Sequence, residues 1–281
     1  MNHLLLGLIL LPLIGAGLIL ITDGQSEAGL RNIRWTALFA TLATFVLSLI
    51  AWHGFNPASA EFQLVDEAAW LSKSIRFKLG VDGFSMPFIL LSTFLMPFCI
   101  VASWVSIEKR VAEYMIAFLV LEALMIGVFA SLDLILFYVF FEAMLVPVYF
   151  LIGGYGTGER AQAAVKFLLY SLFGGLLMLA SIIGLYVIAG SQVGRTFDIG
   201  ALSTLQISAS TQNWLFLGFF IAFAIKAPLW PLHTWLPDAA DSATPGTSVL
   251  LLGVLDKVGT FGMIRYCLNL FPDASKTFTP I

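Results

Sequence analysis

Three ionisable residues lie inside stretches of sequence that are otherwise apolar. Glu142 is in the middle of FYVFFEAMLV (137–146), and Lys226 and Lys257 lie deep inside two further apolar stretches. A carboxylate at the centre of a membrane helix costs about 2.5–3.5 kcal/mol, so it persists only with a buried partner, a water-filled cavity or a bound proton. A buried lysine gives up its proton readily because the charged form is poorly solvated. These residues predict proton or ion handling, and the structural alternative is that they only lock helices together.

Four more ionisable residues are secondary candidates for the same path. Glu122 lies midway along another apolar stretch, and His233, which titrates near neutral pH, follows a group of prolines. Asp256 precedes Lys257 directly, so on a helix we expect their side chains to diverge by about 100° and not to face each other. Asp133 lies in a short linker, where it can instead cap the helix that follows.

The composition indicates an integral membrane protein. Apolar residues make up 59 % of the 281 residues and charged residues 11 %, well below the roughly 25 % of a soluble domain. The net charge of −3 leaves no basic face for nucleic acid. Cys99 and Cys267 lie in apolar runs without metal-ligand spacing and are expected to be packed hydrophobes. Walker A, Rossmann, CxxC and HExxH patterns are absent from the sequence, so we expect no nucleotide, flavin, iron–sulfur or metal site in this chain.

The apolar runs predict an all-α polytopic membrane protein with about eight spans. They are expected near residues 4–21, 35–52, 81–105, 113–131, 134–153, 163–189, 213–231 and 246–270. Only residues 131–133 separate the fourth and fifth spans, which requires an antiparallel hairpin. The long linker 53–80 should be an ordered surface loop. Lysine and arginine in the loops after the first, third and fifth spans favour an outside N-terminus.

The seventh span should be broken. Pro228 follows Lys226 closely, and Pro231 and Pro237 come soon after. Prolines remove amide donors and clash with the preceding turn, so a straight helix through this segment is not expected. Unwound backbone at membrane depth requires protein or a cavity around it, and broken helices mark ion sites in many transporters.

Three stretches of this sequence resemble subunit M of proton-translocating NADH–quinone oxidoreductase (respiratory complex I). They are LILFYVFFEAMLVPVYFLIG (134–153), GFFIAFAIKAPLWPLHTWLPD (218–238) and TPGTSVLLLGVLDKVGTFGMIRY (244–266), and LGVDGFS (79–85) extends the resemblance upstream. The residues of the first stretch resemble subunit M more than the related subunits L and N. The resemblance implies a proton channel in which Glu142 and Lys226 form an ion pair. Opening and closing of that pair would change the proton affinity of Lys226, which would exchange a proton with Lys257 through buried water.

The same resemblance implies an architecture and partners. The family has about fourteen helices with two inverted five-helix repeats. On that pattern, 1–112 is an N-terminal three-helix segment, 113–270 is the first repeat, and 271–281 begins a second half. We expect the chain to be the N-terminal portion of a longer subunit; a naturally split or shortened protein is the alternative.

The implied function is proton translocation coupled to quinone reduction, in the bacterial inner membrane, beside L-like and N-like antiporter-like subunits. NADH, FMN, iron–sulfur clusters and quinone would be bound by partner subunits. Two rival functions share these helices: a subunit of a multisubunit sodium/proton antiporter, and the energy-coupling subunit of a membrane-bound hydrogenase. A purely structural scaffold is a third.

Overall fold

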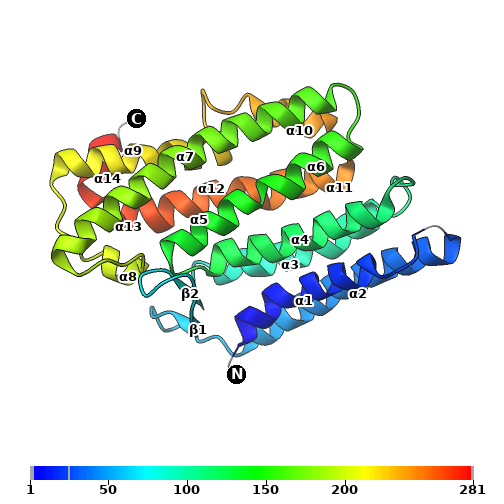
Figure 1. Ribbon diagram of the computed structural model, residues 1–281, viewed down its shortest axis with the longest axis horizontal. Helices are drawn as coiled ribbons and strands as arrows, with labels where there is room; N and C mark the ends of the chain where they lie inside the picture. Colours follow the sequence, from blue (N-terminus) through cyan, green and yellow to red (C-terminus); the bar gives the residue numbers. More distant parts are fainter. Residues whose placement is uncertain (1–2, 25, 280–281) are drawn as a thin grey trace.

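Helices dominate the computed structural model, which describes residues 3–24 and 26–279 (Figure 1). Five helical segments are long and apolar enough to cross a membrane: Glu27–His53, Val111–Ala130, Leu134–Tyr155, Arg160–Gln192 and Pro245–Leu270. Two shorter apolar helices, Leu4–Leu20 and Met86–Ala102, lie beside them. These helices confirm the expectation of a mostly helical chain with several segments that can cross a membrane.

The elements follow one another along the chain with short connections. In order they are α1 (Leu4–Leu20), α2 (Glu27–His53), β1 (Gln63–Ala69), β2 (Arg76–Val81), α3 (Met86–Ala102), α4 (Val111–Ala130), α5 (Leu134–Ala143), α6 (Leu145–Tyr155), α7 (Arg160–Gln192), α8 (Ile199–Leu202), α9 (Ala209–Lys226), α10 (Trp235–Ser242), α11 (Pro245–Leu250), the π-helical η1 (Leu251–Leu255), α12 (Asp256–Gly262), the π-helical η2 (Met263–Cys267), α13 (Leu268–Leu270) and α14 (Pro272–Phe278).

The expectation of a purely helical fold is wrong in the long linker before α3. There β1 and β2 form a two-stranded antiparallel sheet, in which Glu67 lies opposite Lys78. The mixed polar and apolar residues of this linker predicted only an ordered surface loop. Instead, β1 contacts α1, and β2 contacts α1, α4 and α5. Leu79 also makes a bridge to Ser131, so the hairpin contacts the turn between α4 and α5.

The helices lie roughly alongside one another, with their connections at the two ends of the molecule (Figure 1). α1 packs against α2 and α4, and α7 packs against α6 and α9. Residues 131–133 join α4 to α5 as the predicted antiparallel hairpin. Large apolar side chains remain exposed along the outer helices; on α7 they are Val165, Leu169, Leu172, Phe173, Leu176, Ile183 and Val187. An apolar exterior of this kind suits lipid and not water.

Proline explains two interruptions that matter for the candidate site. The fifth expected span is divided at Met144, because Pro147 has no amide to donate to the carbonyl of Ala143 four residues earlier. The seventh expected span ends as a helix at Lys226, two residues before Pro228, and the chain continues through turns to α10. The predicted break beside Lys226 is therefore confirmed.

An ion pair fastens the loop before α3 to the last membrane segment. Arg265 in η2 donates to both carboxylate oxygens of Asp82, at 2.8 and 2.5 Å, and only 9 % of the Arg265 side chain is exposed. Burial by itself would raise the pKa of Asp82, but the hydrogen bonds from Arg265 and Ser85 outweigh it, so the pKa is lowered. The C-terminal end of the long linker is thus held against η2.

Candidate functional site

Glu142 lies near the end of α5, beside the proline-induced interruption. Its Oε1 is buried and has no hydrogen-bond partner among the described residues. The carboxyl group packs directly on the backbone of α7: a Cβ atom added at Gly175 would lie 1.7 Å from Oε1 and 2.5 Å from Cδ of Glu142. Gly175 is therefore the residue that makes room for this carboxyl group inside the helix bundle.

Lys226 is the last residue of α9 and only 1 % of it is exposed. Its ammonium nitrogen has no hydrogen-bond partner among the residues that the structure describes. It faces two aromatic rings instead, at 5.1 Å from the centroid of Phe141 and 5.2 Å from that of Phe167. Aromatic faces stabilise a cation only partly. Lys226 is thus a buried cation whose hydrogen-bonding capacity is unused.

The structure brings Glu142 and Lys226 into one neighbourhood without joining them. Their charges act on each other, yet within residues 3–24 and 26–279 they form no ion pair within 4.0 Å. The ion pair that the family resemblance implies is therefore open in this structure. An acid and a lysine that are near each other inside a helix bundle, but not in contact, leave room for a water molecule between them, and each can bind or release a proton.

Glycines bring the last membrane segment close to the break in α9. A Cβ atom at Gly259 of α12 would lie 2.4 Å from the amide nitrogen of Ala227, and one at Gly262 would lie 2.3 Å from the Phe223 ring. Larger residues at these two positions would push the helices apart. This contact places α12 directly against the unwound end of α9.

Lys257 lies on α12, and its ammonium group contacts its own segment of the chain. Its ammonium group pairs with Asp256 at 2.7 Å and donates to the carbonyl of Leu252 at 3.3 Å, and 42 % of the side chain is exposed. The expectation that Asp256 and Lys257 do not face each other is wrong. The long lysine side chain bends back to its neighbour, and the backbone angle between adjacent residues does not prevent this.

The other carboxylate and histidine candidates form no hydrogen bond or ion pair with Glu142 or Lys226 among the described residues. Glu122 of α4 is completely buried, and neither carboxylate oxygen has a hydrogen-bond partner in the described part of the chain. His233 lies in the turns after the break in α9, and its buried Nδ1 has no hydrogen-bond partner among the residues that the structure describes. Roles for these two residues stay predictions.

Asp133 is a helix cap. Its Oδ1 accepts hydrogen bonds from the amides of Ile135 and Leu136 at 3.0 and 3.1 Å, and its Oδ2 accepts one from the amide of Arg76 at 3.2 Å. Burial raises the pKa of Asp133, although these hydrogen bonds act in the opposite direction. The alternative of a cap at the start of α5 is the one that the geometry supports.

Sequence reasoning missed a tether on the segment after the break. Lys166 of α7 donates to Asp238 at 2.7 Å and to the carbonyl of Thr234 at 2.8 Å. In the sequence Lys166 was visible only as a charge near a loop. Pro228, Pro231 and Pro237 indicated a break after Lys226 but gave no sign of this contact. The indole of Trp235 adds a hydrogen bond to the freed carbonyl of Ile225 at 2.8 Å.

The described residues, 3–24 and 26–279, contain few side chains of the metal-binding types close together. No group of three or more histidine, cysteine, aspartate or glutamate side chains within them could hold a metal ion. Cys99 and Cys267 are buried and unpaired, as packed hydrophobes should be.

Residues 131–281 match the NADH:quinone oxidoreductase/Mrp antiporter transmembrane family. The chain is 46 % identical over 288 residues to NADH-quinone oxidoreductase subunit M of Rhodobacter capsulatus, a match covering 99 % of this chain and 56 % of that protein. It is 43 % identical over 276 residues to NADH-ubiquinone oxidoreductase chain 4 of Arabidopsis thaliana, covering 98 % and 54 %. The chain therefore spans about half the length of the curated relatives that it matches.

Solved structures give the same result for the fold. A chain of respiratory complex I from Thermus thermophilus with bound NADH superposes with a TM-score of 0.83 at 31 % identity, covering 97 % of this chain and 54 % of the other. A chain of an archaeal membrane-bound sulfane sulfur reductase superposes with the same TM-score at 22 % identity, covering 99 % and 56 %. The second likeness concerns the fold alone.

Proposed function

Because the chain belongs to the NADH:quinone oxidoreductase/Mrp antiporter transmembrane family as a homologue of subunit M, we propose that it carries part of a proton path in the membrane arm of an NADH–quinone oxidoreductase. Proton movement would be coupled to quinone reduction elsewhere in the complex. NADH, FMN, the iron–sulfur clusters and quinone would be bound by partner subunits, among them neighbours of the L and N type.

One observation supports this proposal most strongly: Lys226 and the Oε1 atom of Glu142 are buried, and these two groups of opposite charge type are not in contact. A permanent structural ion pair would have both groups within hydrogen-bond distance, because leaving a buried charge unpaired is costly. Here the lysine is surrounded by aromatic rings and lies at a helix end, where the backbone is already unwound. Closure of the gap would stabilise both charges, and opening would favour transfer of the proton between them or to water.

Lys257 is the next proton carrier in this proposal. A carrier at Lys257 would have to exchange Asp256 for a neighbour nearer to Lys226, and its flexible side chain permits that movement. The relatives are about twice as long as this chain, so the exposed face with Lys257 would be covered by the rest of the protein or by an adjacent subunit. Asp256 would then hold the lysine when the path is closed.

The finer architecture is also part of the proposal. We assign about eight membrane crossings, with α1, α3 and α9 added to the five longer segments. Residues 1–112 would form an N-terminal segment, 113–270 the first of two inverted repeats, and 271–281 the start of the second; residues 280–281 lie outside the described residues. The location would be a bacterial inner membrane with the N-terminus outside.

NADH-driven proton uptake into inverted membrane vesicles tests the proposal. Glu142→Gln should abolish uptake at wild-type levels of assembled complex, whereas Glu61→Gln should leave it unchanged. Glu61 is a suitable control because it is an exposed carboxylate on the linker before β1. Normal uptake by Glu142→Gln would remove this residue from the path, and an assembly defect alone would favour the structural scaffold.

The family description also includes Mrp antiporters, and the same vesicles distinguish that function. A sodium/proton antiporter subunit would exchange protons for sodium without NADH. A subunit of a membrane-bound hydrogenase would pump with another electron donor. Proton uptake that requires NADH and is independent of sodium would contradict both.

A further inference from the structure

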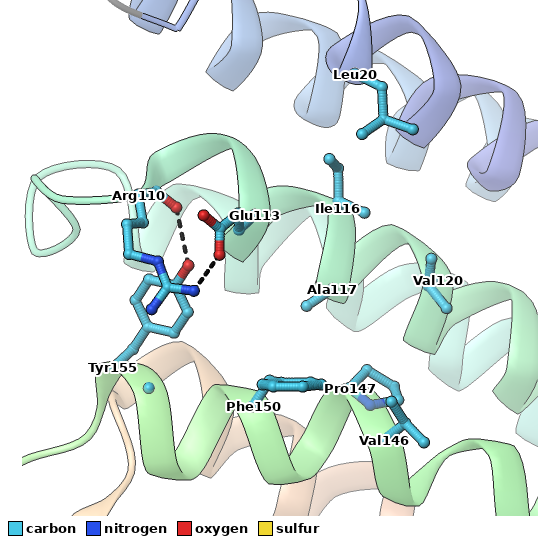
Figure 2. A pocket seen from close by; sticks show the side chains of 11 residues that line it. Leu20, Arg110, Glu113, Ile116, Ala117, Val120, Val146, Pro147, Phe150 and Tyr155 are labelled. Carbon is cyan, nitrogen blue, oxygen red and sulfur yellow. Dashed lines mark hydrogen bonds and ion pairs between the residues drawn. The ribbon is translucent and has the colours of Figure 1, made fainter.

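An apolar groove lies at one end of the helix bundle, between α4 and α6 and beneath the end of α1 (Figure 2). It has a volume of about 370 Å³. Ile116, Ala117 and Val120 of α4 line one side, and Pro147 and Phe150 of α6 line the other (Figure 2). Its floor and walls are almost entirely hydrocarbon.

The mouth of the groove is polar and well ordered. Tyr155 closes this end by donating a hydrogen bond to the carbonyl of Arg110 at 2.9 Å, and the Arg110 guanidinium pairs with Glu113 (Figure 2). Arg110 also lies over the Tyr155 ring, with its guanidinium carbon 5.7 Å from the centroid. These contacts hold the rim in place, and Glu113 neutralises the charge of Arg110.

A second depression of about 280 Å³ adjoins this mouth and shares Gly154 and Tyr155 with the groove. Lys109 and Arg160 line it, and they outweigh the one acidic residue, Glu108. Arg160 uses one guanidinium nitrogen on the carbonyls of Gly154 and Gly156, at 3.3 and 3.0 Å, and so is held at the rim.

Lys109 is an available cation at this place. Its side chain is exposed, and among the described residues it has no hydrogen-bond or ion-pair partner. The cationic depression adjoins an apolar groove. Together they complement an amphiphile, because the depression suits a negative headgroup and the groove suits a hydrocarbon chain.

We propose that the groove binds one acyl chain of an anionic phospholipid whose phosphate lies against Lys109 and Arg160. Val120 is far enough along α4 from Arg110 for the groove to run about 15 Å, at 1.5 Å per residue, from the mouth toward the membrane centre. A transmembrane helix is about 10–12 Å across with its side chains, too wide to enter a groove of this volume. An acyl chain is narrower, and the surrounding bilayer supplies it in excess.

Lipid retention by the purified full chain, measured by native mass spectrometry, tests the proposal. The protein is delipidated and then titrated separately with phosphatidylglycerol and phosphatidylcholine carrying identical acyl chains. Each basic contact near a membrane surface favours an anionic lipid about fivefold, so phosphatidylglycerol should be retained at least that much more strongly. Lys109→Gln should reduce this preference about fivefold, leaving the contribution of Arg160, whereas Arg31→Gln, the same charge change at an exposed position on α2, should not change it.

A second pair of variants tests the apolar part of the site. Ala117→Phe places a ring in the groove and should reduce retention of both lipids, whereas Ala180→Phe, on the exposed face of α7, should reduce neither. If Ala117→Phe does not fold, the smaller Ala117→Leu serves in its place, with Ala180→Leu as its control.

Either of two results would overturn the proposal. One is equal retention of the two lipids by the native chain. The other is unchanged retention in the groove-filling variant; if that variant also fails to assemble with partner subunits, the groove receives a partner and not a lipid. These outcomes are independent of proton uptake, so the lipid site can fail while the proposed proton path stands.

Discussion

Gly175→Ala provides a geometrical test of the Glu142 site without changing any charge. The new Cβ atom would lie 1.7 Å from Oε1 of Glu142, and real Cβ atoms essentially never approach within 3.0 Å. The carboxyl group must therefore move by at least about 1.3 Å, away from α7. Alanine is favoured over glycine inside a helix by about 0.5–1 kcal/mol, so helix formation itself is not impaired. A misplacement of about 1 Å can lower the rate of a proton-transfer step by about a hundredfold.

The assay is NADH-driven proton uptake in inverted vesicles, expressed per assembled complex. Gly175→Ala should lower uptake by about tenfold or more. Gly17→Ala is the matched control, since a Cβ atom there meets nothing within 4 Å, and it should pump normally. Wild-type uptake by an assembled Gly175→Ala complex would show that the position of the carboxyl group against α7 does not matter for proton transfer, contrary to this prediction.

Three further substitutions probe the pair and the ion pairs that support it. Lys226→Met removes an unpartnered buried cation, so the thermal unfolding midpoint should stay the same or rise, while proton uptake should fall about a hundredfold; retained uptake would contradict the proposed path. Asp82→Asn leaves Arg265 buried without its carboxylate and should lower the free energy of unfolding by about 3 kcal/mol at neutral pH, measured by thermal or denaturant unfolding. Because the pKa of Asp82 is lowered in the folded state, its contribution to the free energy of unfolding is fully present above the ordinary aspartate pKa of about 3.9. That contribution is lost as the pH falls through the folded-state pKa. A stability difference between the wild type and Asp82→Asn that persisted in stronger acid would be inconsistent with this ion pair. Asp133→Ala removes a helix cap and should cost about 1 kcal/mol in unfolding experiments with normal uptake per complex, and a specific loss of uptake would instead make Asp133 part of the path.

Local rules of sequence correctly located the most important backbone features. Pro228 predicted the end of α9 at Lys226, because a proline cannot continue the hydrogen-bond ladder and restricts the residue before it. Asp133 followed by an apolar run predicted a cap, and the cap is present. The apolar runs located the membrane helices because each must satisfy its own backbone in lipid.

Tertiary contacts were beyond such rules. The place of Glu142 against Gly175 depends on how α5 and α7 pack, and the glycine pair in α7 gave no sign of its partner. The ion pair between Asp82 and Arg265 joins positions 183 residues apart, which composition and periodicity cannot connect. The angle of about 100° between neighbouring residues of a helix predicted no contact between Asp256 and Lys257. The contact forms because the long lysine side chain bends toward the carboxylate.

The proposed path requires that Glu142 exchanges a proton with Lys226 during turnover. Infrared difference spectroscopy of the assembled complex in membranes, before and after NADH addition, observes the protonated carboxyl group directly. We expect a carboxyl C=O band that changes on NADH addition, disappears in Glu142→Gln, shifts in Lys226→Met and is retained in Glu61→Gln. A spectrum in which no carboxyl band depends on both Glu142 and Lys226, while proton uptake continues, would contradict it.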